Sequence, residues 1–147
     1  MSAIADVQSS KDLRNLPINR VGIKDLRFPI RVRHREGEQA TVARMTMTVF
    51  LPAEQKGTHM SRFVELMEAQ SEAFDAGSML VLLEKMLARL GADAGSISAA
   101  FPFFRTKAAP VSGIRSLLDY DIVLSGDLDG GRYRSRLKIL IPVTSLC

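Results

Sequence analysis

Alternation of apolar and polar residues, interrupted by two segments with helical spacing, constrains the fold of this chain more than any other feature. The segment "ATVARMTMTVFLP" has an apolar side chain at every second position, with Arg44, Thr46 and Thr48 between them. Because successive side chains of a strand point to opposite faces of a sheet, this pattern predicts a strand with one buried face. Similar β-forming patterns occur in residues 23–34, 96–104, 116–125 and 132–143.

Helical spacing replaces this alternation in the middle of the chain. In "GTHMSRFVELMEAQSEAF" the apolar residues from Met60 to Phe74 recur every three or four positions, which predicts an amphipathic helix. Thr58 is its candidate N-cap, because a threonine hydroxyl can accept a hydrogen bond from a backbone N–H of the first turn. The more apolar "MLVLLEKMLARL" predicts a second helix, with Gly91 as its C-cap.

The order of these elements predicts an α+β domain. Strands in blocks around two helices favour an antiparallel sheet with the pair of helices packed on one face. Pro29 indicates that the first strand is an edge strand or irregular, and "REGE" predicts a hairpin turn after it. Residues 1–20 are polar, contain Pro17 and lack a clear period, so we expect an N-terminal arm.

Composition restricts the class of protein. A chain of 147 residues with 46% hydrophobic and 24% charged residues fits one globular domain. No apolar run approaches the ~20 residues that cross a bilayer, so we expect no membrane partner and a cytoplasmic location. A net charge of +4 with only 6% aromatic residues argues against a nucleic-acid-binding module. The single cysteine, Cys147, excludes an internal disulfide and a metal site built from cysteines alone.

The start of the first predicted helix is a candidate binding site. Backbone N–H groups are unpaired in a first helical turn, where the helix dipole is positive, so this end favours an anion. His59, Ser61 and Arg62 place further hydrogen-bonding groups there. A helix start of this composition serves equally often only as a cap, so the stretch alone leaves both interpretations open.

The last predicted strand has a row of cations on one face. Arg132, Arg134, Arg136 and Lys138 alternate there with apolar residues. Four cations on one face repel one another unless they meet solvent, acidic groups or an anion. A solvent-exposed face is the simpler interpretation, and a face toward a phosphate or a subunit is the alternative.

Three segments resemble a known family. "DVQSSKDLRNLPINRVGIKDLRFPI", "LPAEQKGTHMSRFVELME" and "IPVTSLC" closely resemble type IB GTP cyclohydrolases I, the metal-dependent enzymes that open folate biosynthesis in many bacteria. The resemblance implies a tunnelling fold, a strand–strand–helix–helix–strand–strand module that assembles into a barrel in homotetramers. Residues 21–147 are then the first of two tandem modules, and the second module is absent from this chain.

The resemblance also implies the chemistry. In this family a divalent metal (zinc, manganese or iron) activates a water that attacks C8 of the guanine of GTP, giving 7,8-dihydroneopterin triphosphate and formate. Cys147 matches the family's metal-binding cysteine, which makes it the expected catalytic and metal-binding residue. His59, Ser61 and Arg62 match the family's "KGTHMSRF" signature, and we expect them to contact the substrate.

Two alternatives stay open at this point. The chain could be a non-catalytic tunnelling-fold module that binds a purine or pterin, or that serves assembly. A small basic RNA-binding module is the other alternative, and it would require an affinity that falls steeply with salt concentration.

Overall fold

The computed structural model describes residues 14 and 16–145 and confirms an α+β domain. Three strands follow the helices, one more than in the module that the family resemblance implies. The last of them contains the row of cations from Arg132 to Lys138. The elements in chain order are β1 (Ile18–His34), β2 (Gly37–Leu51), α1 (Ser61–Glu68), α2 (Ala76–Leu90), β3 (Ala94–Ala108), β4 (Arg115–Asp129) and β5 (Arg132–Leu140).

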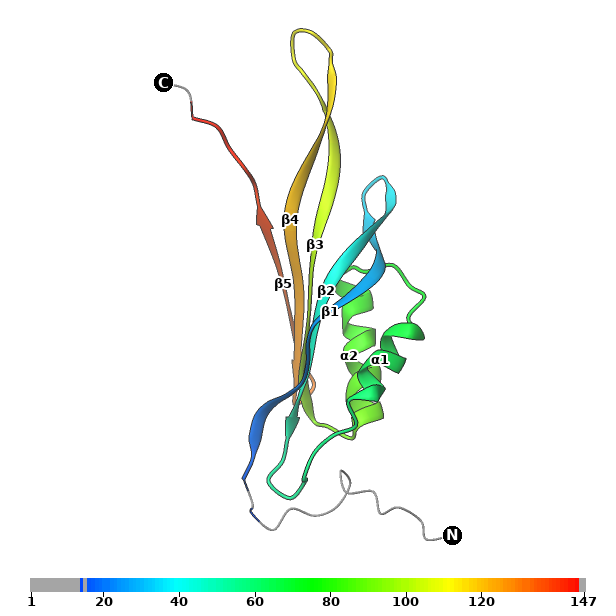
Figure 1. The fold of residues 1–147 in the computed structure, drawn as a ribbon, viewed down its shortest axis with the longest axis vertical. Helices are drawn as coiled ribbons and strands as arrows, with labels where there is room; N and C mark the ends of the chain where they lie inside the picture. The colour runs from blue at the N-terminus through cyan, green and yellow to red at the C-terminus, as the bar shows by residue number, and fades with distance from the viewer. Residues whose placement is uncertain (1–13, 15, 146–147) are drawn as a thin grey trace.

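The five strands form one antiparallel sheet in the order β1-β2-β3-β4-β5, so each strand pairs with its neighbour in sequence. Figure 1 shows both helices on one side of the sheet, which we call the helix face; the opposite side is the open face. The β3–β4 hairpin extends beyond the other strands at the top of that view, and its tip includes fully exposed Val111.

The edge position of β1 agrees with the prediction from Pro29. The Pro29 position pairs with Val42 of β2, and proline is tolerated there because the other side of an edge strand needs no N–H donor. The β1–β2 register shifts between Ile23 and Leu26, and Asp25 in that interval has a φ of 57°. β1 is therefore both an edge strand and an irregular one, as the sequence predicted.

The core lies between the helix face and the two helices. The alternating side chains Met45, Met47 and Ile97 are fully buried against α2 and α1. The helices contribute a second set of fully buried side chains: Phe63, Met67, Met79, Leu83 and Met86. Gly126 of β4 allows α2 to approach closely, because a Cβ there would lie 2.9 Å from Leu83 Cδ1 and from Met79 Cγ.

The first helix differs from the prediction at both ends. Met60, not Thr58, occupies the N-cap position, has helical backbone angles and makes no side-chain cap bond, so the Thr58 prediction is wrong. Thr58 is instead buried. Phe74 lies outside the helix, which ends at Glu68; the Phe74 N–H donates to the Arg31 carbonyl at 2.7 Å and its carbonyl accepts from Arg33 N–H. The backbone pairing of Phe74 with β1 prevailed over its helical spacing.

The second helix has well-defined caps. It begins at Ala76, three residues before the predicted segment, because Asp75 and Ser78 form a capping box: Ser78 N–H donates to Asp75 Oδ1 at 2.7 Å, and Asp75 N–H donates to Ser78 Oγ at 2.9 Å. Gly91 ends the helix in the left-handed conformation, with a φ of 62°, as predicted.

The predicted arm 1–20 lies largely outside the described residues, and β1 already begins at Ile18. No helix in the described part of the chain has the length and apolarity that crossing a membrane requires.

Candidate functional site

The candidate site residues at the start of α1 lie beside the end of α2. Ser61 is exposed at the first position of α1, and His59 is half-buried in the turn before it. Arg62 reaches across to α2, where its Nη1 donates to the Arg89 carbonyl at 3.1 Å. Arg89 in turn forms an ion pair with Glu65 of α1. The signature stretch thus joins the two helices as well as beginning one.

The backbone at this helix start is less available to an anion than the sequence suggested. Arg62 N–H donates to the His59 carbonyl at 3.1 Å, and Phe63 N–H donates to the Met60 carbonyl at 3.2 Å. These two bonds satisfy donors that an uncapped helix would leave open. Anion binding here would therefore depend mainly on side chains, and the assignment of His59, Ser61 and Arg62 to substrate contact stays a prediction.

The predicted metal ligand, Cys147, lies outside the described residues. Among residues 14 and 16–145 no group of three or more histidine, aspartate and glutamate side chains is arranged to hold a metal ion. The described residues do not fit a metal site by themselves, so the role of Cys147 stays a prediction.

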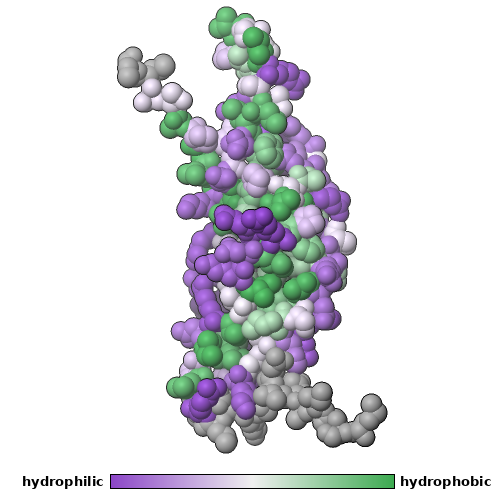
Figure 2. Space-filling view, in the orientation of Figure 1, coloured by the Kyte–Doolittle hydropathy of each residue, from purple (hydrophilic) through white to green (hydrophobic). Residues whose placement is uncertain are grey.

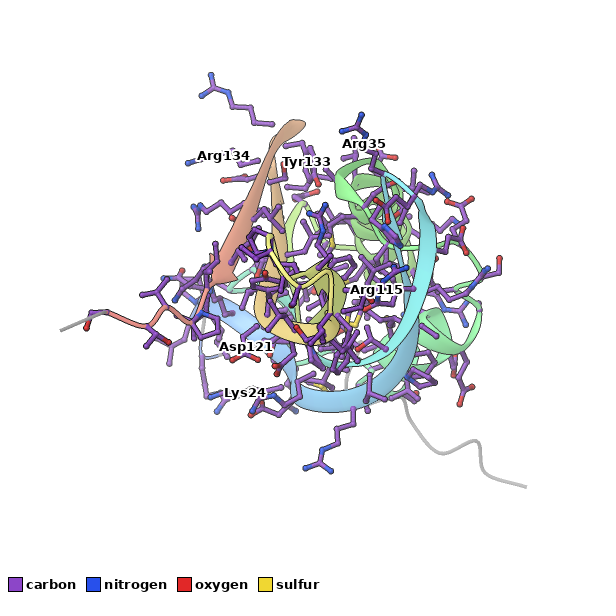
Figure 3. The ribbon with its side chains drawn as sticks, turned by 90° about the horizontal axis from the view of Figure 1, so that it is seen from above. Lys24, Arg35, Arg115, Asp121, Tyr133 and Arg134 are labelled. Atoms are coloured by element: carbon purple, nitrogen blue, oxygen red, sulfur yellow. The ribbon has the colours of Figure 1, made fainter. Side chains whose placement is uncertain are left out.

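The cation row of β5 lies on the open face. Figure 3 shows Arg134 and Tyr133 on opposite sides of β5, with Tyr133 toward the helices. The β4–β5 register places Asp127 opposite Arg134 and Asp129 opposite Arg132, so the row faces carboxylates of the neighbouring strand. Arg136 and Asp127 form an ion pair at 3.7 Å. The row is solvent-exposed in this structure, and its repulsion is reduced by aspartates that the sequence places at two-residue spacing in β4.

A shallow cavity of about 300 Å³ adjoins this row. Arg134, Arg136 and Asp127 line one side of it, and Arg20 and Thr48 line the other. Thr48 Oγ1 and Ser96 Oγ are hydrogen-bonded at 2.8 Å in its floor. Charges of both signs line this cavity, so it has no clear preference for an anion or a cation.

The helix face has an apolar groove of about 340 Å³ where α2 begins. Phe101, Ile122 and Leu137 line it, with Asp75 at its rim. Tyr133 ties β5 to this region, because its hydroxyl donates to the Ala76 carbonyl at 2.7 Å. Burial raises the pKa of Tyr133 above its ordinary value. Hydrogen bonding from the Ser78 amide lowers the pKa of Asp75, assisted by Arg33.

A larger cavity of about 590 Å³ lies between the β1–β2 turn and the β3–β4 hairpin. Its lining includes His34, Arg35 and Arg115, residues far apart in the sequence. His34 is half-buried, with its ring edge-on to Phe103 at a centroid distance of 5.3 Å. Sequence reasoning missed this cavity, since no pattern along one segment indicates that these elements meet.

Comparison with known proteins agrees with the resemblance in the sequence. The family model described as type I GTP cyclohydrolase folE2 matches residues 4–147. The chain is 65% identical over all 147 residues to GTP cyclohydrolase FolE2 of Neisseria gonorrhoeae, of which it covers 57%. It is 50% identical over its whole length to GTP cyclohydrolase FolE2 of Herminiimonas arsenicoxydans, of which it covers 56%.

The chain therefore spans about half the length of the curated relatives it matches. The family model covers almost every residue of the chain, and the identity to these relatives is 50–65%. The chain belongs to the type I GTP cyclohydrolase folE2 family, the type IB enzymes that its sequence resembles.

Proposed function

We propose that this protein acts as a GTP cyclohydrolase I, hydrolysing GTP to 7,8-dihydroneopterin triphosphate and formate in the first step of tetrahydrofolate biosynthesis. The observation that supports this most is the 65% identity over all 147 residues to a relative named GTP cyclohydrolase FolE2. The activity belongs to the whole protein, with GTP as its substrate and the cytoplasm as its location.

The proposed enzyme uses a divalent metal, which would supply an activated water for attack on guanine C8. Cys147 is the proposed ligand of this chain, because a thiolate is a strong ligand for zinc and related ions. The described residues do not complete such a site, so its other ligands are proposed to lie elsewhere in the whole protein. Zinc, manganese and iron all remain candidates.

His59, Ser61 and Arg62 are proposed to contact the substrate close to an intersubunit boundary. An arginine has five N–H donors, and only the Nη1 bond to the Arg89 carbonyl is recorded for the Arg62 side chain among the described residues. Arg62 can therefore hold α1 against α2 and still donate to a substrate oxygen. Ser61 is exposed and has a hydroxyl group for the same purpose.

The proposed assembly is a homotetramer. Both outer strands of the described sheet, β1 and β5, have an edge without a partner strand. β5 also exposes the apolar side chains of Leu137, Ile139 and Leu140. Exposed edges and apolar patches of this kind are usually covered in a stable protein, which supports association.

A turnover assay tests this function directly. The purified whole protein is incubated with GTP and added zinc or manganese, and product is measured as neopterin fluorescence after oxidation and dephosphorylation. We expect turnover in the natural protein and a loss of more than about 100-fold in Cys147→Ser, because removing a metal ligand costs more than removing a second-shell group. No turnover by folded, metal-loaded natural protein would contradict the proposal.

The signature residues need a separate comparison. Arg62→Ala should raise KM for GTP, and Arg27→Ala, an exposed arginine of β1, is the matched control that removes the same charge. Circular dichroism and urea unfolding of both variants separate a lost substrate contact from a loosened α1. An unchanged KM in folded Arg62→Ala would contradict the role in substrate binding.

A further inference from the structure

Three arginines that are distant in the sequence surround the 590 Å³ cavity at the hairpin end of the sheet, which we call the arginine groove. Arg35 comes from the β1–β2 turn, Arg105 from β3 and Arg115 from the first position of β4. Figure 3, which looks down on this end of the molecule, labels Arg35 and Arg115. Antiparallel pairing within the β1–β2 and β3–β4 hairpins, and of β2 with β3 between them, brings the three segments together.

These arginines differ from the other arginines nearby, because their side chains have no ion-pair or hydrogen-bond partner among the described residues. Within residues 14 and 16–145 no ion pair or hydrogen bond is recorded for the side chains of Arg35, Arg105 and Arg115. By contrast, Arg31 and Arg33 of the adjoining strand β1 form ion pairs with Glu38 and Asp75. The cations of the groove are therefore free to bind a ligand.

The charge around the groove is strongly unbalanced. Glu36 is the one carboxylate among the described residues that line it, against three guanidinium groups. Thr106 adds a hydroxyl donor to the same lining. Clustered positive charge of this kind attracts anions, and a guanidinium matches the geometry of a phosphate with two parallel N–H donors.

The walls of the groove are held by contacts that do not involve the arginines. The Gln39 side chain of β2 makes two hydrogen bonds with the Phe104 backbone of β3, donating to its carbonyl at 2.8 Å and accepting from its N–H at 2.7 Å. The edge-on contact of His34 with Phe103 joins β1 to β3 at the same level. A groove fixed in this way loses less conformational freedom when a ligand binds.

We propose that the arginine groove binds a polyphosphate anion, with Arg35, Arg105 and Arg115 as its ligating residues. Its volume falls within the roughly 300–1,000 Å³ of ordinary small-molecule sites, which is ample for a triphosphate group. Three cations suit a linear polyphosphate better than a monoanion, because each phosphate can face its own guanidinium. The anion is either the triphosphate of a nucleotide substrate or a separate phosphorylated ligand, and the test distinguishes these sources.

Isothermal titration of the purified full chain with inorganic triphosphate tests the groove without reference to turnover. We expect Arg35→Ala/Arg115→Ala to weaken saturable binding by at least about tenfold, since hydrogen bonds to charged groups contribute on this scale. Binding should also weaken as salt rises. Arg27→Ala/Arg132→Ala is the matched control, because it also removes two exposed arginines, neither of which lines the groove, and it should leave the titration unchanged.

A variant that binds triphosphate more tightly separates a change in the groove from damage to the fold. Glu36→Gln removes the one carboxylate that lines the groove and should tighten triphosphate binding about two- to fivefold, which a damaged fold would not produce. The proposal would be overturned if the double arginine variant, confirmed as folded by circular dichroism, bound triphosphate with the same affinity as the natural protein. It would also be overturned by the absence of saturable triphosphate binding to the natural protein.

Kinetics with GTP then identify the source of the anion. A rise in KM for GTP in the double arginine variant assigns the groove to the substrate triphosphate. An unchanged KM together with lost triphosphate binding assigns it to a separate phosphorylated ligand. Absence of GTP turnover in the natural protein contradicts the proposed function, whereas the titration result stands independently of it.

Discussion

The helix face of the sheet has two regions with the same sequence pattern and opposite surroundings. Met47 of β2 and Ile97 of β3 are fully buried under the helices. Leu137 and Ile139 of β5 alternate in the same manner and point to the same face, yet they are 62% and 47% exposed. Alternation therefore predicts which face a side chain occupies, but not whether another element covers that face.

Element length explains the difference. α2 has 15 residues, which gives a helix of about 22 Å, whereas a strand of 15 residues such as β3 spans about 50 Å. α1, with eight residues, is shorter still. Two short helices cannot cover the whole length and width of a sheet of long strands, so β5 and the β3–β4 tip remain exposed. Figure 2 shows hydrophobic surface at that tip, where Val111 and Ile114 are exposed.

The largest expected effect comes from truncating one leucine in each region. Leu83→Ala of α2 should reduce the free energy of unfolding by about 2–5 kcal/mol, because Leu83 is fully buried and truncation leaves a cavity. Leu137→Ala of β5 should change it by less than about 0.5 kcal/mol if β5 stays uncovered. Urea unfolding of both variants measures the two values.

A large loss of unfolding free energy in Leu137→Ala would contradict the expectation that this face of β5 is uncovered. It would show that the exposed face of β5 is buried in solution, as association would require. Measuring the Leu137→Ala effect at several protein concentrations separates the two cases, because stability gained from association depends on concentration.

The sequence predicted the fold well where one local rule determined the structure. The strand segments, the edge position of β1 and the Gly91 cap all follow from periodicity, Pro29 and glycine geometry. Thr58 and Phe74 were placed wrongly because tertiary contacts prevailed over local preference: Thr58 is buried, and Phe74 pairs with β1. Local rules contain no information about these distant partners.

The candidate site was less predictable for the same reason. His59, Ser61 and Arg62 adjoin one another in the sequence, so a single motif identified them. Their contact with Arg89 was not predictable, since it depends on how α1 packs against α2. The arginine groove requires side chains from three separate elements, and only the paired hairpins bring Arg35 near Arg115.

The second prediction concerns the capping box at the boundary between the two regions. Asp75→Ala removes the acceptor for Ser78 N–H and the ion pair with Arg33, and should cost about 0.5–2 kcal/mol of unfolding free energy. The folded-state pKa of Asp75 lies below the ordinary 3.8, so its stabilisation is present above that pH and is lost as pH falls through the folded value. Urea unfolding from pH 7 into the acid range should therefore show a smaller pH dependence in Asp75→Ala. An identical acid profile would contradict this role.

The third prediction concerns Tyr133, whose hydroxyl joins β5 to the covered region. Tyr133→Phe should cost about 0.5–1.5 kcal/mol, the usual contribution of one hydrogen bond, because the Ala76 carbonyl loses its 2.7 Å donor. Burial raises the folded-state pKa above 10.0, so the associated stability is present below that pH and is lost as pH rises through the folded value. Thermal unfolding from pH 8 to above pH 10 measures both the cost of the lost hydrogen bond and the loss of stability at high pH, with Tyr120→Phe as the control. Equal losses in both variants would mean that the hydroxyl contact does not anchor β5.

The smallest effect is expected on the open face, where Arg136 and Asp127 form an ion pair at 3.7 Å with side chains 69% and 34% exposed. Exposed pairs gain little because water screens the attraction and ordering two side chains costs entropy. A double-mutant cycle with Arg136→Ala and Asp127→Ala should give a coupling below about 0.5 kcal/mol that decreases further as salt is added. A coupling well above 1 kcal/mol, insensitive to salt, would mean that this face is shielded from water in solution. The open face would then resemble the covered part of the helix face, and the cation row of β5 would lie against another surface rather than in solvent.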